Sequence, residues 1–146
     1  LSHFAIIVIL IVAAAQLTHA DPLVTYPLRI KKHEIRVEVA NTGQSRLRGL
    51  MYRDKLAQNR GMIFSYPRAE RSAMWMKNTN VPLSVAFLDE QGVIINIEDM
   101  QPQTLDPHAS ERPAKYSIET NLGWFKRNGI GPGTKVKGLE KAPKAE

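Results

Sequence analysis

Residues 81–97 read VPLSVAFLDEQGVIINI, and this stretch decides the fold class. Residues 81–88 are almost wholly apolar, as expected for a strand that is covered on both faces. The next four residues, Asp-Glu-Gln-Gly, are typical of a turn. Apolar residues at positions 93, 95 and 97 then alternate with Asn96 and Glu98, which favours a second strand. The stretch therefore predicts a β-hairpin.

The flanking sequence extends this prediction to a mainly β domain. Asn41 and Asn121 each stand where a helix N-cap is expected, so we predict two short helices, the second ending at Gly129. No regular helices separate the strands, which excludes a doubly wound fold and favours one mainly β sandwich or barrel, bordering on α+β. Further strands are predicted around residues 28–30, 35–39, 62–64, 73–79, 114–118 and 134–136.

Composition narrows the class of protein. The 146 residues correspond to one ordinary domain, and a hydrophobic content of 43% excludes disorder over the whole chain. There is no cysteine, which excludes disulfides, thiol chemistry and a lipid anchor through cysteine. The net charge of +6 favours acidic partners such as anionic lipid or acidic glycans, although solubility alone also explains it.

The first twenty residues predict where the protein is located rather than a part of its fold. Residues 4–15 read FAIIVILIVAAA, a run too short for the ~20 residues that span a membrane but typical of a secretory signal peptide. We therefore expect cleavage after Ala20 and a periplasmic or secreted protein, which excludes nucleic acid as a partner. The alternative is an uncleaved anchor facing the periplasm. The predicted units are the signal peptide 1–20, one domain over 21–138 and a polar flexible tail over 139–146.

The sequence carries no complete catalytic or metal-binding motif. His33 and His108 lie far apart and in no ligand spacing, so neither a metal nor a cofactor is expected. There is no Gly-x-Ser-x-Gly motif, and the glycines at 129–133 follow a helix rather than precede one. Acid–base chemistry would require Asp89 and Glu119 to meet. Asp89 is more simply a turn residue, and Glu119 is expected to be solvated or paired with an arginine.

One polar and aromatic patch stands out at residues 75–79. In a strand, Trp75, Lys77 and Thr79 would share a face, with successive side chains ~7 Å apart. An aromatic ring beside an ammonium group can hold a sugar, another ring or an anion. Asn78 would point the other way and fix a neighbouring loop. In the alternative interpretation, Trp75 packs in the core and Lys77 reaches past it to solvent.

Several blocks of the sequence form a recognisable set: Arg48-Gly49-Leu50-Met51-Tyr52-Arg53, Gly61-Met62-Ile63-Phe64, Trp75-Met76-Lys77-Asn78-Thr79, Val81-Pro82-Leu83, Phe87-Leu88-Asp89, Pro113-Ala114-Lys115-Tyr116 with Glu119, and Asn128-Gly129-Ile130 with Pro132-Gly133. Together they resemble domain-of-unknown-function family 192 (DUF192) over roughly residues 28–138. The resemblance implies a compact, jelly-roll-like mainly β fold, often behind a signal peptide or a membrane anchor, and it implies no particular reaction. Family members typically carry Asp after Pro-Leu, where this chain has Ser84.

Taken together, these patterns predict an exported or envelope-associated, non-enzymatic domain that binds a small polar, anionic or glycan-like ligand. Association with a membrane surface is a second kind of contact that the basic charge allows. One alternative is a hydrolase or lyase acting on envelope polymer, with Asp89 or Glu119 as acid or base and Arg53 or Lys77 stabilising charge. Another is an assembly or chaperone-like module with an exposed apolar patch or an open sheet edge. The predicted ligand contacts are Arg48, Arg53, Trp75, Lys77, Asn78 and Thr79.

Overall fold

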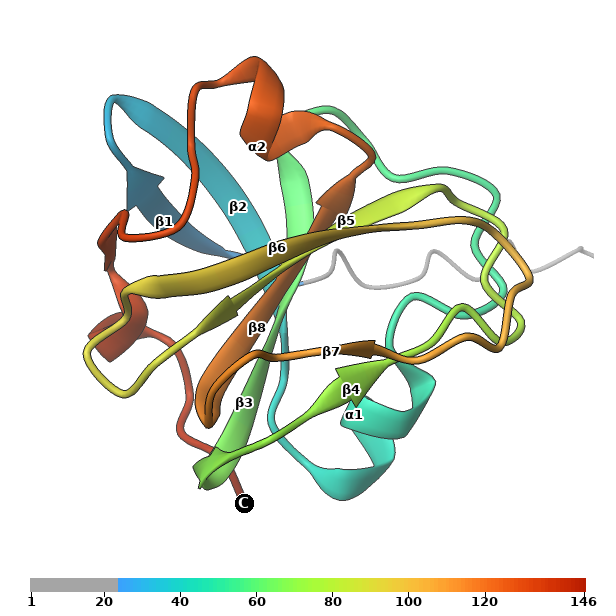
Figure 1. Ribbon diagram of the computed structural model, residues 1–146, viewed down its shortest axis with the longest axis horizontal. Coiled ribbons are helices and arrows are strands. Elements are labelled where there is room, and N and C mark those ends of the chain that lie inside the picture. The colour runs from blue at the N-terminus through green and yellow to red at the C-terminus, as the bar shows by residue number, and fades with distance from the viewer. Residues whose placement is uncertain (1–23) are drawn as a thin grey trace, which may run out of the picture.

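A seven-stranded sheet organises residues 24–146, the part of the chain that the computed structural model describes (Figure 1). The predicted signal peptide lies outside these residues. All neighbouring strands are antiparallel except β2 and β3, which run parallel. In spatial order the strands are β6 (Ile94–Met100), β5 (Leu83–Leu88), β8 (Ala114–Asn121), β3 (Arg60–Glu70), β2 (His33–Ala40), β1 (Tyr26–Ile30) and β9 (Val136–Lys137).

The predicted hairpin is confirmed as β5 and β6. All six residues of β5 are buried, as the apolar run predicts for a strand covered on both faces. The Asp89 carboxylate accepts hydrogen bonds from the backbone N–H groups of Gln91 and Val93, each at 2.9 Å. Asp89 therefore closes the turn through its own side chain.

The sheet curls until its two edge regions meet. The N–H of Ile94 donates to the carbonyl of Thr134 at 2.9 Å, and the N–H of Gly133 donates to the carbonyl of Ile94 at 2.8 Å. A further bridge joins Val93 to Lys135. The enclosed face holds a core that includes Ile35, Ile63 and Ile118, together with two aromatic residues from the short helix α2 (Trp124–Arg127). The mainly β class with two short helices is thus confirmed.

A second core covers the opposite face of the central strands. Helix α1 (Gly43–Arg48) and a small sheet of β4 (Ala73–Met74) and β7 (His108–Ala109) belong to this side, away from α2 (Figure 1). The strand registers place side chains in rows across β2, β3, β8 and β5 on this face. One row is Glu38, Met62, Glu119 and Val85. Arg36 and Arg60 are partners two residues earlier on β2 and β3.

Both helix starts differ from the prediction for the same physical reason. Thr42, not Asn41, caps α1 and forms a reciprocal capping box with Ser45. Gly123, not Asn121, precedes α2. The two asparagine amides instead donate to distant backbone carbonyls: Asn41 to Lys144 at 2.9 Å and Asn121 to Leu56 at 2.8 Å.

The strand predicted over residues 73–79 is wrong beyond its first two residues. The chain turns after β4, where the N–H of Thr79 donates to the carbonyl of Met76 at 3.2 Å. Asn78 adopts a left-handed backbone with a φ of 52°, which ends the strand alternation. Thr79 is therefore buried instead of sharing an exposed face with Trp75 and Lys77.

Two further features concern the ends of the described region. Residues 139–146 begin with the 3-10 turn η1 (Leu139–Lys141), and the Glu146 N–H donates to the carbonyl of Asn41 at 2.8 Å. Within residues 24–146, no helix has the length and apolar character needed to cross a membrane.

Candidate functional site

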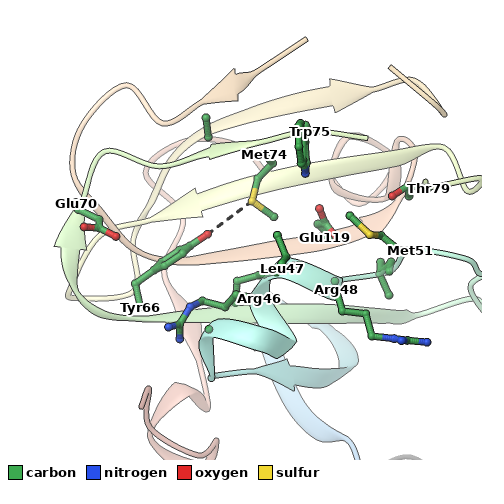
Figure 2. A pocket seen from close by; sticks show the side chains of 15 residues that line it. Arg46, Leu47, Arg48, Met51, Tyr66, Glu70, Met74, Trp75, Thr79 and Glu119 are labelled. Carbon is green, nitrogen blue, oxygen red and sulfur yellow. Dashed lines mark hydrogen bonds between the residues drawn. The ribbon is translucent and has the colours of Figure 1, made fainter. Parts of the chain in front are cut away.

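A pocket of about 390 Å³ opens between α1, β4 and the outer face of the sheet (Figure 2). It combines apolar, aromatic, cationic and carboxyl groups from segments that lie far apart in the sequence. Its lining residues are Gly43, Arg46, Leu47, Arg48, Gly49, Leu50, Met51, Phe64, Tyr66, Glu70, Ala73, Met74, Trp75, Thr79 and Glu119.

Glu119 supplies the carboxyl group deep in this pocket. Its strand, β8, lies between β3 and β5, and the residue is only 4% exposed. Within the described residues, no group donates a hydrogen bond to this carboxyl, and no cation pairs with it. Burial raises its pKa from 4.5 to about 8. The prediction that Glu119 is solvated or paired with an arginine is therefore wrong.

The wall beside Glu119 is made by a tyrosine and a methionine. The Tyr66 hydroxyl lies 3.2 Å from the Ser117 hydroxyl and 3.6 Å from the Met74 sulfur (Figure 2). Burial raises the pKa of the Tyr66 phenol, an effect that its hydrogen bond to Ser117 partly opposes. The phenol is therefore neutral at physiological pH and adds a second neutral O–H group to the pocket.

Two arginines from α1 line the pocket in different ways. Arg46 donates to the backbone carbonyls of Asn41 at 2.7 Å and Ser65 at 2.9 Å, and its guanidinium lies 6.0 Å from the centre of the Tyr66 ring. This residue is held in place by the fold. Arg48 is exposed and makes no hydrogen bond to another described side chain or carbonyl, and Figure 2 shows it extending along the rim. Arg48 is therefore available to a ligand.

The mouth of the pocket is apolar. Leu47 is 68% exposed and Trp75 is 44% exposed, and both are lining residues (Figure 2). The Lys77 ammonium lies 5.3 Å from the centre of the Trp75 ring. Trp75 therefore does not pack in the core, and the interpretation that placed it there is wrong. An exposed indole beside an exposed leucine forms a platform for a ligand.

Of the six predicted contacts, three line the pocket: Arg48, Trp75 and Thr79. Lys77 lies next to it, over the indole. The Asn78 amide instead donates to the Tyr52 hydroxyl at 3.0 Å, which fixes the adjoining loop. Arg53 forms a bidentate salt bridge with Glu38, at 2.6 and 2.8 Å, and lines a separate groove.

The structure does not bring the two candidate carboxylates together. Asp89 lies in the β5–β6 turn and does not line the pocket, whereas Glu119 does. Ser84, the departure from the family pattern, also lies elsewhere. Its hydroxyl donates to Asp99 at 2.6 Å and accepts from the N–H of Gly123 at 2.9 Å. Over residues 24–146, no group of three or more His, Asp or Glu side chains could hold a metal ion.

Several pocket residues are not among the predicted ligand contacts. Arg46 and Leu47 lie on α1, a helix that the sequence predicts without indicating what its residues contact. Tyr66 lies within β3 and Met74 is the last residue of β4, and no spacing in the sequence links them to Glu119.

Comparison with known proteins gives the family. The DUF192 family pattern, described as "Uncharacterized ACR", matches residues 26–138. The chain belongs to the DUF192 family. The family description assigns no function, and a comparison with curated proteins finds no match.

Two solved structures resemble this DUF192 domain over most of its length. One is a proposed transcription regulator from Sinorhizobium meliloti, with 34% identity, a TM-score of 0.77, and coverage of 80% of this chain and 95% of the other. The second is a protein of unknown function from Novosphingobium aromaticivorans, with 31% identity, a TM-score of 0.75, and coverage of 77% and 84%. Both support the fold.

Proposed function

We propose that this domain is a non-enzymatic binding module for a small polar ligand, with a glycan as the favoured class, in the pocket over Glu119. One observation carries the proposal. A carboxyl that is 4% exposed, and that no described group hydrogen-bonds, faces a pocket with an apolar mouth. Within residues 24–146, the side-chain atom that is fully buried without a hydrogen-bond partner is the Ser72 hydroxyl oxygen, so the Glu119 oxygens keep some access to the pocket. A ligand in the pocket can therefore form hydrogen bonds with a carboxyl that no described group engages.

The protonation state of Glu119 favours a hydroxyl-bearing ligand. With a pKa of about 8, the carboxyl is mostly protonated at neutral pH. A protonated carboxyl both donates and accepts hydrogen bonds, and so does a sugar hydroxyl. A cationic ligand is disfavoured because Arg46 and Arg48 line the same pocket.

The walls suit the rest of a sugar ring. The half-exposed Trp75 indole offers a flat apolar face on which the C–H groups of a ring can pack. Arg48 can pair with a carboxylate, which extends the proposal to acidic sugars. A neutral acid, an aromatic face and a guanidinium in one pocket thus fit a polar ligand with an apolar face.

The proposal is tested by NMR chemical-shift mapping with three disaccharide probes: cellobiose, chitobiose and digalacturonic acid. We expect saturable shifts at the Trp75 indole and the Met51 methyl with at least one probe. Replacing Glu119 with Met should weaken that binding by about tenfold, because the thioether has a similar length but cannot donate a hydrogen bond and accepts one only weakly. Glu34→Met, an exposed change on β2, is the matched control. If no probe shifts these signals, or if Glu119→Met binds as well as the original protein, the proposal is wrong.

A second candidate is a hydrolase or lyase that acts on a glycan polymer. The raised pKa of Glu119 favours it, because a proton donor must be protonated near the working pH. The second carboxyl that lines the pocket belongs to Glu70, so Glu70 takes the place of Asp89 as the second catalytic carboxyl in this candidate function. The test is release of reducing ends or unsaturated products from the polymer. Release that Glu119→Gln and Glu70→Gln both abolish would establish the enzyme, and binding without release would exclude it.

We also propose that the domain works outside the cytoplasm. The support is the composition of residues 1–20, and the net charge of +6 suits contact with an anionic membrane surface. N-terminal sequencing of protein from the periplasmic fraction should give Asp21 as the first residue. An intact leader in the membrane fraction would instead show an anchor.

A further inference from the structure

A second groove, of about 350 Å³, lies at one end of the same sheet face and shares no lining residue with the pocket over Glu119. Four cationic side chains line it, against a single carboxylate. We call it the arginine groove; its residues are Thr25, Arg36, Glu38, Arg53, Lys55, Leu56, Ala57, Arg60 and Gly61.

The single carboxylate does not neutralise the groove. Both oxygens of Glu38 are engaged by Arg53, at 2.6 and 2.8 Å. The Glu38 and Arg53 side chains are 14% and 29% exposed, so this pair forms a partly buried wall. In the described region, no carboxylate pairs with Arg36, Lys55 or Arg60. Three positive charges therefore remain in the groove without compensation.

Two of these charges are held side by side. Arg36 and Arg60 are register partners on the parallel strands β2 and β3, where like charges directly opposite each other are destabilising. The Arg36 Nε and the Arg60 Nη1 both donate to the Thr25 hydroxyl oxygen, at 3.1 and 3.2 Å. One hydroxyl oxygen orients two guanidinium groups but cannot neutralise them.

We propose that the arginine groove binds a tetrahedral oxyanion, a phosphate or sulfate group, between Arg36 and Arg60. Arg36 also donates from Nη2 to the Thr25 carbonyl at 3.3 Å, so Thr25 occupies one edge of that guanidinium. The remaining N–H donors of Arg36 and Arg60 can be presented to such a group, and Lys55 adds a point charge. The Thr25 hydroxyl, which accepts from both arginines, keeps its own proton for donation to the anion. Arg53 does not bind the anion, because its guanidinium is already paired with the Glu38 carboxylate. This inference does not rest on the glycan pocket.

The experiment titrates the purified protein with inorganic phosphate at constant ionic strength and follows the Arg Nε–H signals by NMR. We expect saturable shifts of the Arg36 and Arg60 signals. The double variant Arg36→Gln with Arg60→Gln should bind phosphate at least about tenfold more weakly. The control is Arg71→Gln with Arg112→Gln, two exposed arginines outside the groove, which removes the same net charge.

Three results would overturn the proposal. The first is the absence of saturable shifts at Arg36 and Arg60, and the second is an equal loss of affinity in the control variant. The third is undiminished phosphate binding by Arg36→Lys with Arg60→Lys, which keeps the positive charges but removes the paired N–H donors of the guanidinium groups. Arg60→Gln alone gives the same comparison if the double variant fails to fold. Vesicles of phosphatidylglycerol and of phosphatidylcholine then separate the sources. Binding to phosphatidylglycerol vesicles but not to phosphatidylcholine vesicles, lost in the double variant, supports a lipid headgroup as the ligand. Binding of phosphate without binding to either vesicle supports a soluble phosphate ester.

Discussion

Glu38 and Glu119 lie in the same row across the sheet with only Met62 between them, yet among the described residues only Glu38 has a cation partner. The two positions are two strand spacings apart, or roughly 10 Å. Arg53 reaches Glu38 from the loop after α1, whereas Glu119 faces the pocket. The fold therefore places two glutamates on one face of the sheet but pairs only one of them, Glu38, with a positive charge.

The first prediction concerns pH. The folded pKa of Glu119 is raised to about 8 from 4.5, so the folded state keeps a proton that the unfolded state loses. The stability present at low pH is therefore lost as pH rises from about 4.5 to about 8. The loss should reach a few kcal/mol. Urea unfolding across this window should show the decline in the original protein and a weaker decline in Glu119→Gln. Parallel declines would mean that Glu119 has an ordinary pKa.

The second prediction concerns the pair of Arg53 and Glu38. A double-mutant cycle with Arg53→Gln and Glu38→Gln should give a coupling energy of about 1 kcal/mol, since the pair is bidentate but partly exposed. Arg53→Gln should leave disaccharide binding unchanged, because Arg53 does not line the pocket over Glu119. Loss of that binding, in a variant that unfolds normally, would place Arg53 back among the ligand contacts.

The third prediction separates binding from stability at the pocket mouth. Trp75 is 44% exposed, so Trp75→Ala should lower the free energy of unfolding by only about 1 kcal/mol. The same change should weaken disaccharide binding by at least about tenfold, because the indole is the apolar platform. Leu105→Ala, at a residue 63% exposed and outside the pocket, is the control. Unchanged binding after joint replacement of Trp75 and Lys77, in a folded protein, would contradict the assignment.

The fourth prediction concerns the close approach of β3 and β8. A Cβ atom at Gly61 would lie 2.4 Å from the backbone carbonyl oxygen of Glu119, so Gly61→Ala must push the strands apart. We expect a loss of about 1–3 kcal/mol in the free energy of unfolding. Gly43→Ala, where nothing lies within 4 Å, should be nearly neutral in the same denaturation experiment. Equal effects from the two changes would contradict the strand geometry.

The fifth prediction concerns the departure from the family pattern at Ser84. Ser84→Ala leaves the Gly123 N–H and the Asp99 carboxylate without their hydroxyl partner and should cost about 1–3 kcal/mol. Disaccharide binding should be unaffected, since Ser84 does not line the pocket. Calorimetric unfolding and the NMR titration measure the two quantities separately. A variant with full stability and lost binding would show instead that Ser84 serves the ligand site.

Local chemistry made much of the fold predictable. The hairpin of β5 and β6 follows from an apolar run, an aspartate that bonds its own backbone, and a glycine. The helix caps were misplaced because Asn41 and Asn121 bond to carbonyls 103 and 65 residues away, which no local pattern shows. The strand at 73–79 failed for a local reason, a left-handed Asn78, which the alternation of side chains does not reveal.

The candidate site was less predictable than the fold. The motif at 75–79 led to Trp75, because an aromatic residue beside a lysine carries a recognisable chemistry. The alternation of side chains around Glu119 does not show that α1 and β4 cover the face on which this residue lies. Capture of Arg53 by Glu38 likewise depends on how the loop after α1 folds back on β2. The positions of these residues therefore depend on long-range contacts, which no local sequence pattern shows.

The most direct test of the central claim is a site-specific NMR titration of the Glu119 carboxyl, with and without a saturating disaccharide probe. The account predicts a pKa of about 8 without the probe and a clear change in the carboxyl signal when it binds. A pKa near 4.5, together with a carboxyl signal that no probe alters, would contradict the account.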